Sequence, residues 1–195
     1  MDKQNKIKKL FPLLKNFGWL NYNRHSIIKE KRLGIGDEWV IRSTKNMVVF
    51  VLEGKITCKS NQSQAAVFTN GVMFFIPEKC RELSFMSSSE TLLLIISLQY
   101  KVTPLDCFDL DDLQQMEFGM KMIESVPFSM AINSALRKYL DMLLLFNRQG
   151  LRYPHYNDDK LKELMLILKA FYPKEDLYKF FFSFKCKISS RGKKW

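Results

Sequence analysis

The stretch MVVFVLEGKITCK, residues 47–59, sets the expectation for the first half of the chain. Its unbroken apolar run at 47–52 predicts a buried strand, and Glu53-Gly54 predicts a tight turn. Polar residues then alternate with Ile56 and Cys58, which predicts a second, half-buried strand at 55–59. Further short strands are expected on both sides of this pair, at 39–41, 65–69, 72–76, 83–86 and 91–98, with the tight-turn signal Asn70-Gly71 between two of them. Such spacing predicts a small barrel or sandwich.

Beyond residue 100 the apolar period becomes that of helices. One helix is predicted over 131–147, ending at Asn147 and Gly150, and a second over 158–172, capped by Asn157. A short third helix is expected after Pro173. The stripe of the first helix consists of Ile132, Leu136, Leu140, Leu143 and Leu144. Strands followed by an antiparallel helical pair predict an α+β architecture, in which the stripes pack on the barrel or on a second subunit.

Composition and charge limit the classes of protein to which this chain can belong. The 195 residues carry a formal net charge of +11, and Lys and Arg crowd both ends of the chain. Solvated basic ends are expected, with nonspecific nucleic-acid binding through phosphate contacts as the alternative. The four cysteines form no C-x-x-C pair, so free thiols are expected. No apolar run reaches 18 residues and no signal-peptide cleavage site follows the start, which predicts a cytoplasmic protein without a membrane partner.

Several segments resemble AraC-type transcription regulators. Residues 47–56 are similar to a strand pair of the cupin barrel in these regulators, and residues 70–77 are similar to its next hairpin. Residues 105–110, 136–145 and 160–182 resemble a subgroup found in Bacteroides-type bacteria. The resemblance implies a cupin-like (double-stranded β-helix or jelly-roll) barrel followed by helices. The expected organisation is a basic segment at 1–24, the barrel at 25–104, a helical dimerisation subdomain at 105–182 and a basic tail at 183–195.

The resemblance also implies a role. Such a domain senses a small-molecule effector, for which a sugar is one candidate, and forms a homodimer. In these regulators the chain continues beyond the helices into helix-turn-helix motifs, whereas residues 183–195 show no likeness to that part. A prematurely ended gene and a natural short paralogue would both give such a tail. DNA contact is therefore expected only through a missing or separate helix-turn-helix domain.

Many cupins are metal enzymes, which hold the ion with two His and a Glu in a first motif and a His in a second. By register, the first-motif positions fall near Arg42, Thr44 and Met47. The second motif begins well at Gly71 and Pro77 and then has Lys79 and Glu82 where Gly and His are expected. Arginine, threonine and methionine at the first-motif positions cannot replace the imidazole and carboxylate ligands, and His25 and His155 lie outside the predicted strands. We therefore expect no catalytic residue, metal or cofactor, and keep a metal-dependent cupin enzyme as the least favoured alternative.

The same inward positions define a candidate ligand pocket. Arg42, Thr44 and Glu82 would supply polar groups, and Met47, Val49 and Val51 would supply the apolar wall. The alternative is a closed core that fills the barrel with side chains. For the dimer, the candidate contact residues are Leu136, Leu140, Leu143 and Leu144 of the first helix.

Overall fold

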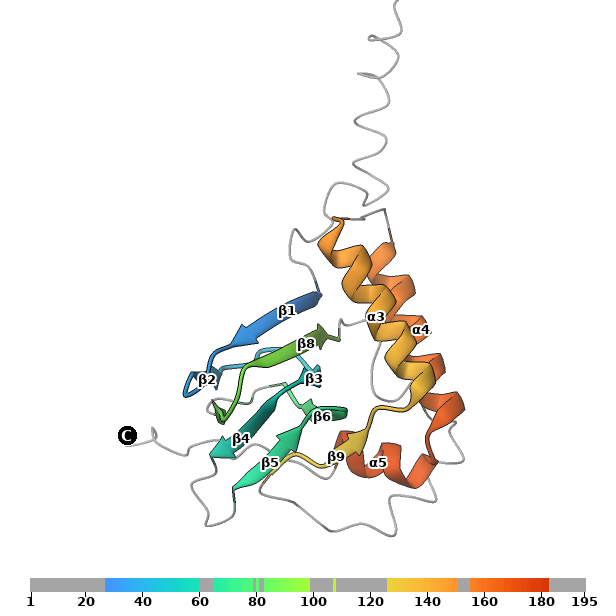
Figure 1. Cartoon of the computed structure of the whole chain (residues 1–195). Coiled ribbons are helices and arrows are strands. Elements are labelled where there is room, and N and C mark those ends of the chain that lie inside the picture. Colours follow the sequence, from blue (N-terminus) through green and yellow to red (C-terminus); the bar gives the residue numbers. More distant parts are fainter. Residues whose placement is uncertain are drawn as a thin grey trace, which may run out of the picture.

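The computed structural model describes residues 27–59, 65–78, 80, 83–98, 107, 126–150 and 155–182. In these residues nine strands are followed by three helices (Figure 1). The strands are β1 (Ile28–Leu33), β2 (Glu38–Ile41), β3 (Met47–Glu53), β4 (Lys55–Lys59), β5 (Ala66–Thr69), β6 (Val72–Ile76), β7 (Leu83–Ser87), β8 (Thr91–Ser97) and β9 (Ser129–Ala131). The helices are α3 (Ser134–Arg148), α4 (Tyr156–Phe171) and α5 (Lys174–Phe182).

Two antiparallel sheets form the β part. The larger sheet has the order β1-β8-β3-β6-β9 and the smaller sheet has the order β2-β7-β4-β5. Consecutive strands mostly alternate between the two sheets, so the chain winds back and forth across the gap between them. The strands β1 and β2, which follow each other in sequence, are edge strands of different sheets. The α+β expectation of strands followed by helices is confirmed.

The apolar patterns of the strands follow from which faces are buried. In β3, Val48, Phe50 and Leu52 face the helices, and the residues between them, Val49 and Val51, face the smaller sheet. The larger sheet is thus buried on both faces, which explains the unbroken apolar run of β3. In the smaller sheet, strand β4 alternates between buried residues, Ile56 and Cys58, that face the larger sheet and more exposed neighbours.

The helices cover the face of the larger sheet that is turned away from the smaller one (Figure 1). Asn133 caps α3, since its side-chain oxygen accepts a hydrogen bond from Leu136 N at 2.8 Å. The Tyr172 hydroxyl accepts a hydrogen bond from Asn133 N and donates one to Ala131 O, which ties the end of α4 to the start of α3. Arg137 donates to Leu52 O at 3.2 Å and so attaches α3 to β3.

Three local predictions need correction. Asn157 does not cap the second helix, because α4 begins at Tyr156 after His155, whose φ is +67°. Strands β1 and β9 were not predicted, and β9, from the region expected to be purely helical, pairs with β6. Cys58 and Cys107 are free thiols as expected, but Cys80 is disulfide-bonded.

Candidate functional site

A pocket lies at the open side of the two sheets, between the edge strands β1 and β2. Its volume is about 560 Å³, within the range of ~300–1,000 Å³ common for small-molecule sites. The first residue of β3 and the end of β8 complete its wall together with the loop 42–45. The pocket thus lies where no further strand of the described residues closes the sandwich.

The lining is cationic and apolar. Its residues are the cations Lys29, Lys31, Arg42 and Lys45, the acid Glu30, the apolar Ile27, Trp39, Val40, Ile41, Met47 and Ile95, and the hydroxyl-bearing Ser43, Thr44 and Ser97. Ile27, Ile41 and Ile95 are nearly fully buried, whereas Lys29 and Arg42 are exposed. Charged side chains therefore surround the mouth of a pocket whose deeper wall is apolar.

Hydrogen bonds fix the loop 42–45. The Ser43 hydroxyl donates to Lys45 O at 2.5 Å and accepts from Lys45 N at 3.2 Å, and Ser43 N donates to Cys80 O. Asn46, the next residue, accepts from Glu78 N through its side chain and from Leu98 N through its carbonyl. The loop is thereby tied to the chain beyond β6 and to the end of β8, so Arg42 and Thr44 stand on a fixed backbone.

The charges of the pocket are not balanced. Lys29, Lys31, Arg42 and Lys45 form no ion pair with a carboxylate of the described residues. Glu30, the acid of the lining, instead binds Arg148 and Arg32, at 2.8 Å each. The hydrogen bond from Arg148 is the largest cause that holds the pKa of the Glu30 carboxyl below its usual value, so this acid is ionised and already paired. The pocket therefore presents an excess of positive charge.

Aromatic residues fill the space between the sheets next to the pocket. Phe68, Phe74 and Phe85 are buried to 1 % exposure or less, with ring centroids 4.3 to 6.0 Å apart. Trp39 stacks on Phe85 at 5.4 Å and forms the boundary between this core and the pocket. The Lys31 ammonium lies 5.9 Å from the Trp39 ring centroid, at the distance of a cation–π contact.

The structure brings together half of the predicted pocket residues. Arg42, Thr44 and Met47 line the pocket. Val49 and Val51 are fully buried in the aromatic core between the sheets and do not line it. Glu82 lies outside the described residues. A role in ligand binding stays a prediction for all of them.

Lys29, Lys31 and Trp39 line the pocket without having been predicted to do so. Both lysines lie on β1, which was not recognised because most of its residues, Lys29 to Arg32, are charged. That charge was itself a signal, because edge strands commonly carry charged residues that prevent pairing with other chains. Trp39 was placed on a strand but was not assigned to the pocket.

The predicted dimer residues are buried within one chain. Leu136, Leu140 and Leu143 have no exposed surface and Leu144 has 7 %, because they pack against the larger sheet and α4. They could reach a second copy only by leaving this core. Dimerisation itself stays a prediction.

The described residues bear on the metal-enzyme hypothesis. No group of three His, Cys, Asp or Glu among them could hold a metal ion. In a separate respect, no helix in the same ranges has the length and hydrophobicity to cross a membrane. His155 directly precedes α4 and belongs to none of the strands, and His25 lies outside the described residues. The basic ends at 1–24 and 183–195 also lie outside them, so nucleic-acid binding there stays a prediction.

Comparison with solved structures identifies the fold. No family model and no curated protein matches this sequence. ToxT from Vibrio cholerae O395, bound to (E)-4-(8-methylnaphthalen-1-yl)but-3-enoic acid, aligns with a TM-score of 0.55 and 11% identity over 79% of this chain and 57% of ToxT. The apo K231A variant of ToxT from strain SCE256 aligns with a TM-score of 0.52 and 10% identity over 80% of this chain and 57% of ToxT.

The fold is shared with ToxT. At about one-tenth sequence identity the alignment shows the fold and carries no ligand or activity across. This chain spans less than two thirds of the length of the ToxT chain.

Proposed function

We propose that this chain is a non-enzymatic regulatory domain of the AraC type, which binds a small carboxylic acid with an apolar body in the pocket between β1 and β2. The observation that carries the proposal is a set of four cations, unpaired among the described residues, around a deep apolar wall: Lys29, Lys31, Arg42 and Lys45. A carboxylate would lie at the cations and the apolar body against Met47 and Ile95.

The comparisons support this ligand class. ToxT, an AraC-family regulator, has been solved with (E)-4-(8-methylnaphthalen-1-yl)but-3-enoic acid and, in another structure, with an unsaturated fatty acid. Each ligand combines a carboxyl group with a large apolar body. The strand orders β1-β8-β3-β6 and β2-β7-β4-β5 also support the jelly-roll form of the barrel that the AraC resemblance implies.

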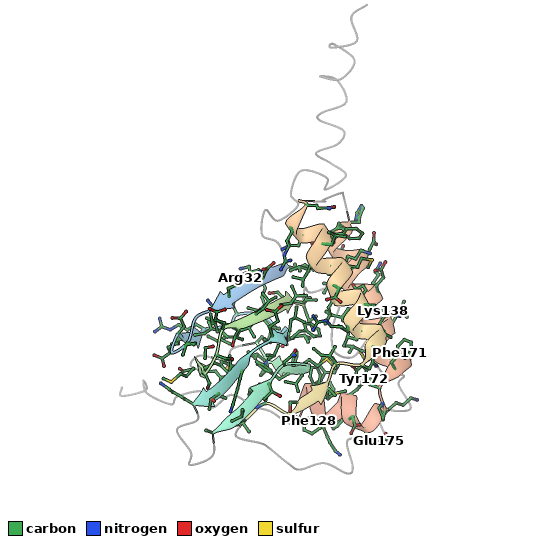
Figure 2. The ribbon with its side chains drawn as sticks, viewed as in Figure 1. Arg32, Phe128, Lys138, Phe171, Tyr172 and Glu175 are labelled. Carbon is green, nitrogen blue, oxygen red and sulfur yellow. The ribbon has the colours of Figure 1, made fainter. Side chains whose placement is uncertain are left out.

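Titration calorimetry tests the proposal. Decanoate, below its micelle concentration, should bind the wild-type chain, and decan-1-ol should bind more weakly because it lacks the charge. Lys31→Met should weaken decanoate binding about tenfold, since a charge pair at a partly exposed site contributes about 1.4 kcal/mol. Lys138→Met is the matched control, because Lys138 is exposed on α3 and does not line the pocket (Figure 2). A chain that binds glucose but not decanoate would contradict the proposal in favour of a sugar effector.

We further propose that the helical layer forms a homodimer through its exposed side. Leu145, Leu166 and Phe171 are 51%, 66% and 57% exposed, which is high for large apolar residues. Phe171 lies at the end of α4, on the side away from the sheets (Figure 2). Sedimentation equilibrium should show a dimer at micromolar concentration. Leu166→Glu should shift it to a monomer. Ile35→Glu is the matched control and should leave the dimer intact, because Ile35 is a 75% exposed apolar residue between β1 and β2, outside the helical layer.

A further inference from the structure

Strand β1 is a wall that the pocket and the helical layer share. It is an edge strand, paired only with β8 among the described residues. Lys29 and Lys31 line the pocket, whereas Ile28 packs with the helices on the opposite face. Glu30, between the two lysines, extends its carboxylate to Arg148 of α3. Neighbouring residues of one strand thus serve the ligand site and the attachment of a helix.

The contact between Glu30 and Arg148 is a two-point clamp. Arg148 Nε lies 2.8 Å from Glu30 Oε2, and Arg148 Nη2 lies 3.0 Å from Oε1. Arg32 donates to Oε1 as well, so two guanidinium groups hold one carboxylate whose side chain is 18% exposed. Arg148 is the last residue of α3. The clamp therefore joins the pocket wall to the end of the helix, just before the chain turns towards α4.

We propose that the Glu30–Arg148 clamp couples ligand binding in the pocket to the attachment of the α3–α4 helical layer. The proposal rests on the proposed function, because it needs an anion held by Lys29 and Lys31. An edge strand with a partner on one side only is held in place by its remaining contacts, and the clamp is one of these. The clamp holds β1 in the position in which Lys29 and Lys31 line the pocket. A bound anion in turn restrains β1 and favours the clamp. Such coupling is reciprocal by thermodynamic necessity.

The sign of one substitution separates coupling from a plain charge effect. If Glu30 acted only through its negative charge, Glu30→Gln would remove repulsion near the pocket and strengthen decanoate binding. If the clamp fixes β1, Glu30→Gln weakens decanoate binding although it makes the pocket more positive. Arg148→Met should weaken it to the same degree, roughly fivefold, at the low end of measured couplings between sites. The double variant should bind no worse than either single one, because both remove one interaction.

The matched control is Arg137→Met. Arg137 also lies on α3, pairs with Asp141 and contacts β3 rather than β1. It should therefore leave decanoate affinity unchanged even though α3 loses a cation and an ion pair. A loss of affinity equal to that of Arg148→Met would mean that any weakening of α3 lowers affinity, and would overturn the proposal.

Hydrogen exchange supplies a second readout. Decanoate should slow amide exchange in the last turn of α3 in the wild-type chain and in Arg137→Met, and not in Arg148→Met. Wild-type binding with unchanged affinity in Glu30→Gln and Arg148→Met would overturn the coupling and leave the proposed function standing. A wild-type chain that binds no decanoate would overturn both.

Discussion

Replacing Gly54 and Gly71 by alanine, one at a time, distinguishes the energetic cost of backbone strain from that of a steric clash. Gly54 and Gly71 both follow a strand at a tight turn, with φ of +81° and +82°. A Cβ at Gly71 would meet no atom within 4 Å. A Cβ at Gly54 would lie 2.2 Å from Glu90 O and 2.7 Å from Thr91 Cα, both backbone atoms. The two positions therefore differ in the space around them and hardly in conformation.

The expected magnitudes follow from these distances. At Gly71, the left-handed conformation costs Ala about 1–2 kcal/mol, partly offset by about 0.4–1 kcal/mol from the stiffer unfolded chain. At Gly54 the same terms apply, and the Glu90–Thr91 backbone must also move, which adds about 1–3 kcal/mol. The movement also disturbs the hydrogen bond that Lys55 N donates to the Thr91 hydroxyl. We expect a loss of about 1 kcal/mol for Gly71→Ala and about 3 kcal/mol for Gly54→Ala.

Urea unfolding followed by circular dichroism measures both free energies of unfolding. The turn at Gly54 lies at the end of β3 opposite to Met47, the pocket residue, so decanoate affinity should stay at the wild-type value in the folded fraction of either variant. Losses that agree within about 0.5 kcal/mol, well under the added clash cost, would show that the backbone near Thr91 yields freely. That result would refute the reasoning from close contact.

Three further predictions follow from the pocket, the clamp and the core. In a series from hexanoate to decanoate, each added CH₂ should tighten binding about fourfold until the pocket is filled, because burying one such group contributes ~0.8 kcal/mol. Equal affinities across the series, measured by calorimetry, would contradict an apolar wall. The pKa of Glu30 is lowered from its usual 4.5, chiefly by the Arg148 hydrogen bond. The ionised carboxylate therefore stabilises the fold above pH 4.5, and this contribution is lost as the pH falls through the lowered pKa. The difference in unfolding free energy between wild type and Glu30→Gln should shrink as the pH is lowered from neutral through that pKa. Burial raises the pKa of the Cys58 thiol to about 11, so this thiol should resist Ellman's reagent at about pH 8 in the folded chain and react in urea.

Some strands were predictable from the sequence and others were not. The bounds of β4 and β6 agree with the apolar runs and turn signals that predicted them. The charged strand β1 and the three-residue β9 have no apolar pattern of their own and form because a neighbouring strand offers backbone partners. The Asn133 cap of α3 was in principle readable, because Asn is a preferred cap and Leu136, the donor of its bond, belongs to the apolar stripe.

The site was only partly predictable because its wall is made by residues distant in sequence. A hollow barrel would have placed Val49 and Val51 of β3 in the pocket beside Met47, as was predicted. In the structure the two valines do not line the pocket, because the rings of Phe68, Phe74 and Phe85 pack together beside them and fill the space there. Sequence shows that these rings are large but does not show that they converge.

A filled interior has a consequence for where a ligand can bind. Once aromatic rings occupy the space between the sheets, a place for a ligand remains at the open side between β1 and β2, where no further strand of the described residues closes the gap. Edge strands tolerate charged residues there because their side chains reach solvent, and β1 carries two of the four pocket cations. The residues that protect the sheet edge are therefore the same residues that would attract an anion. In this fold a charged edge strand can give rise to a ligand site without disturbing the packed core, and the helix held by Glu30 lies directly behind it.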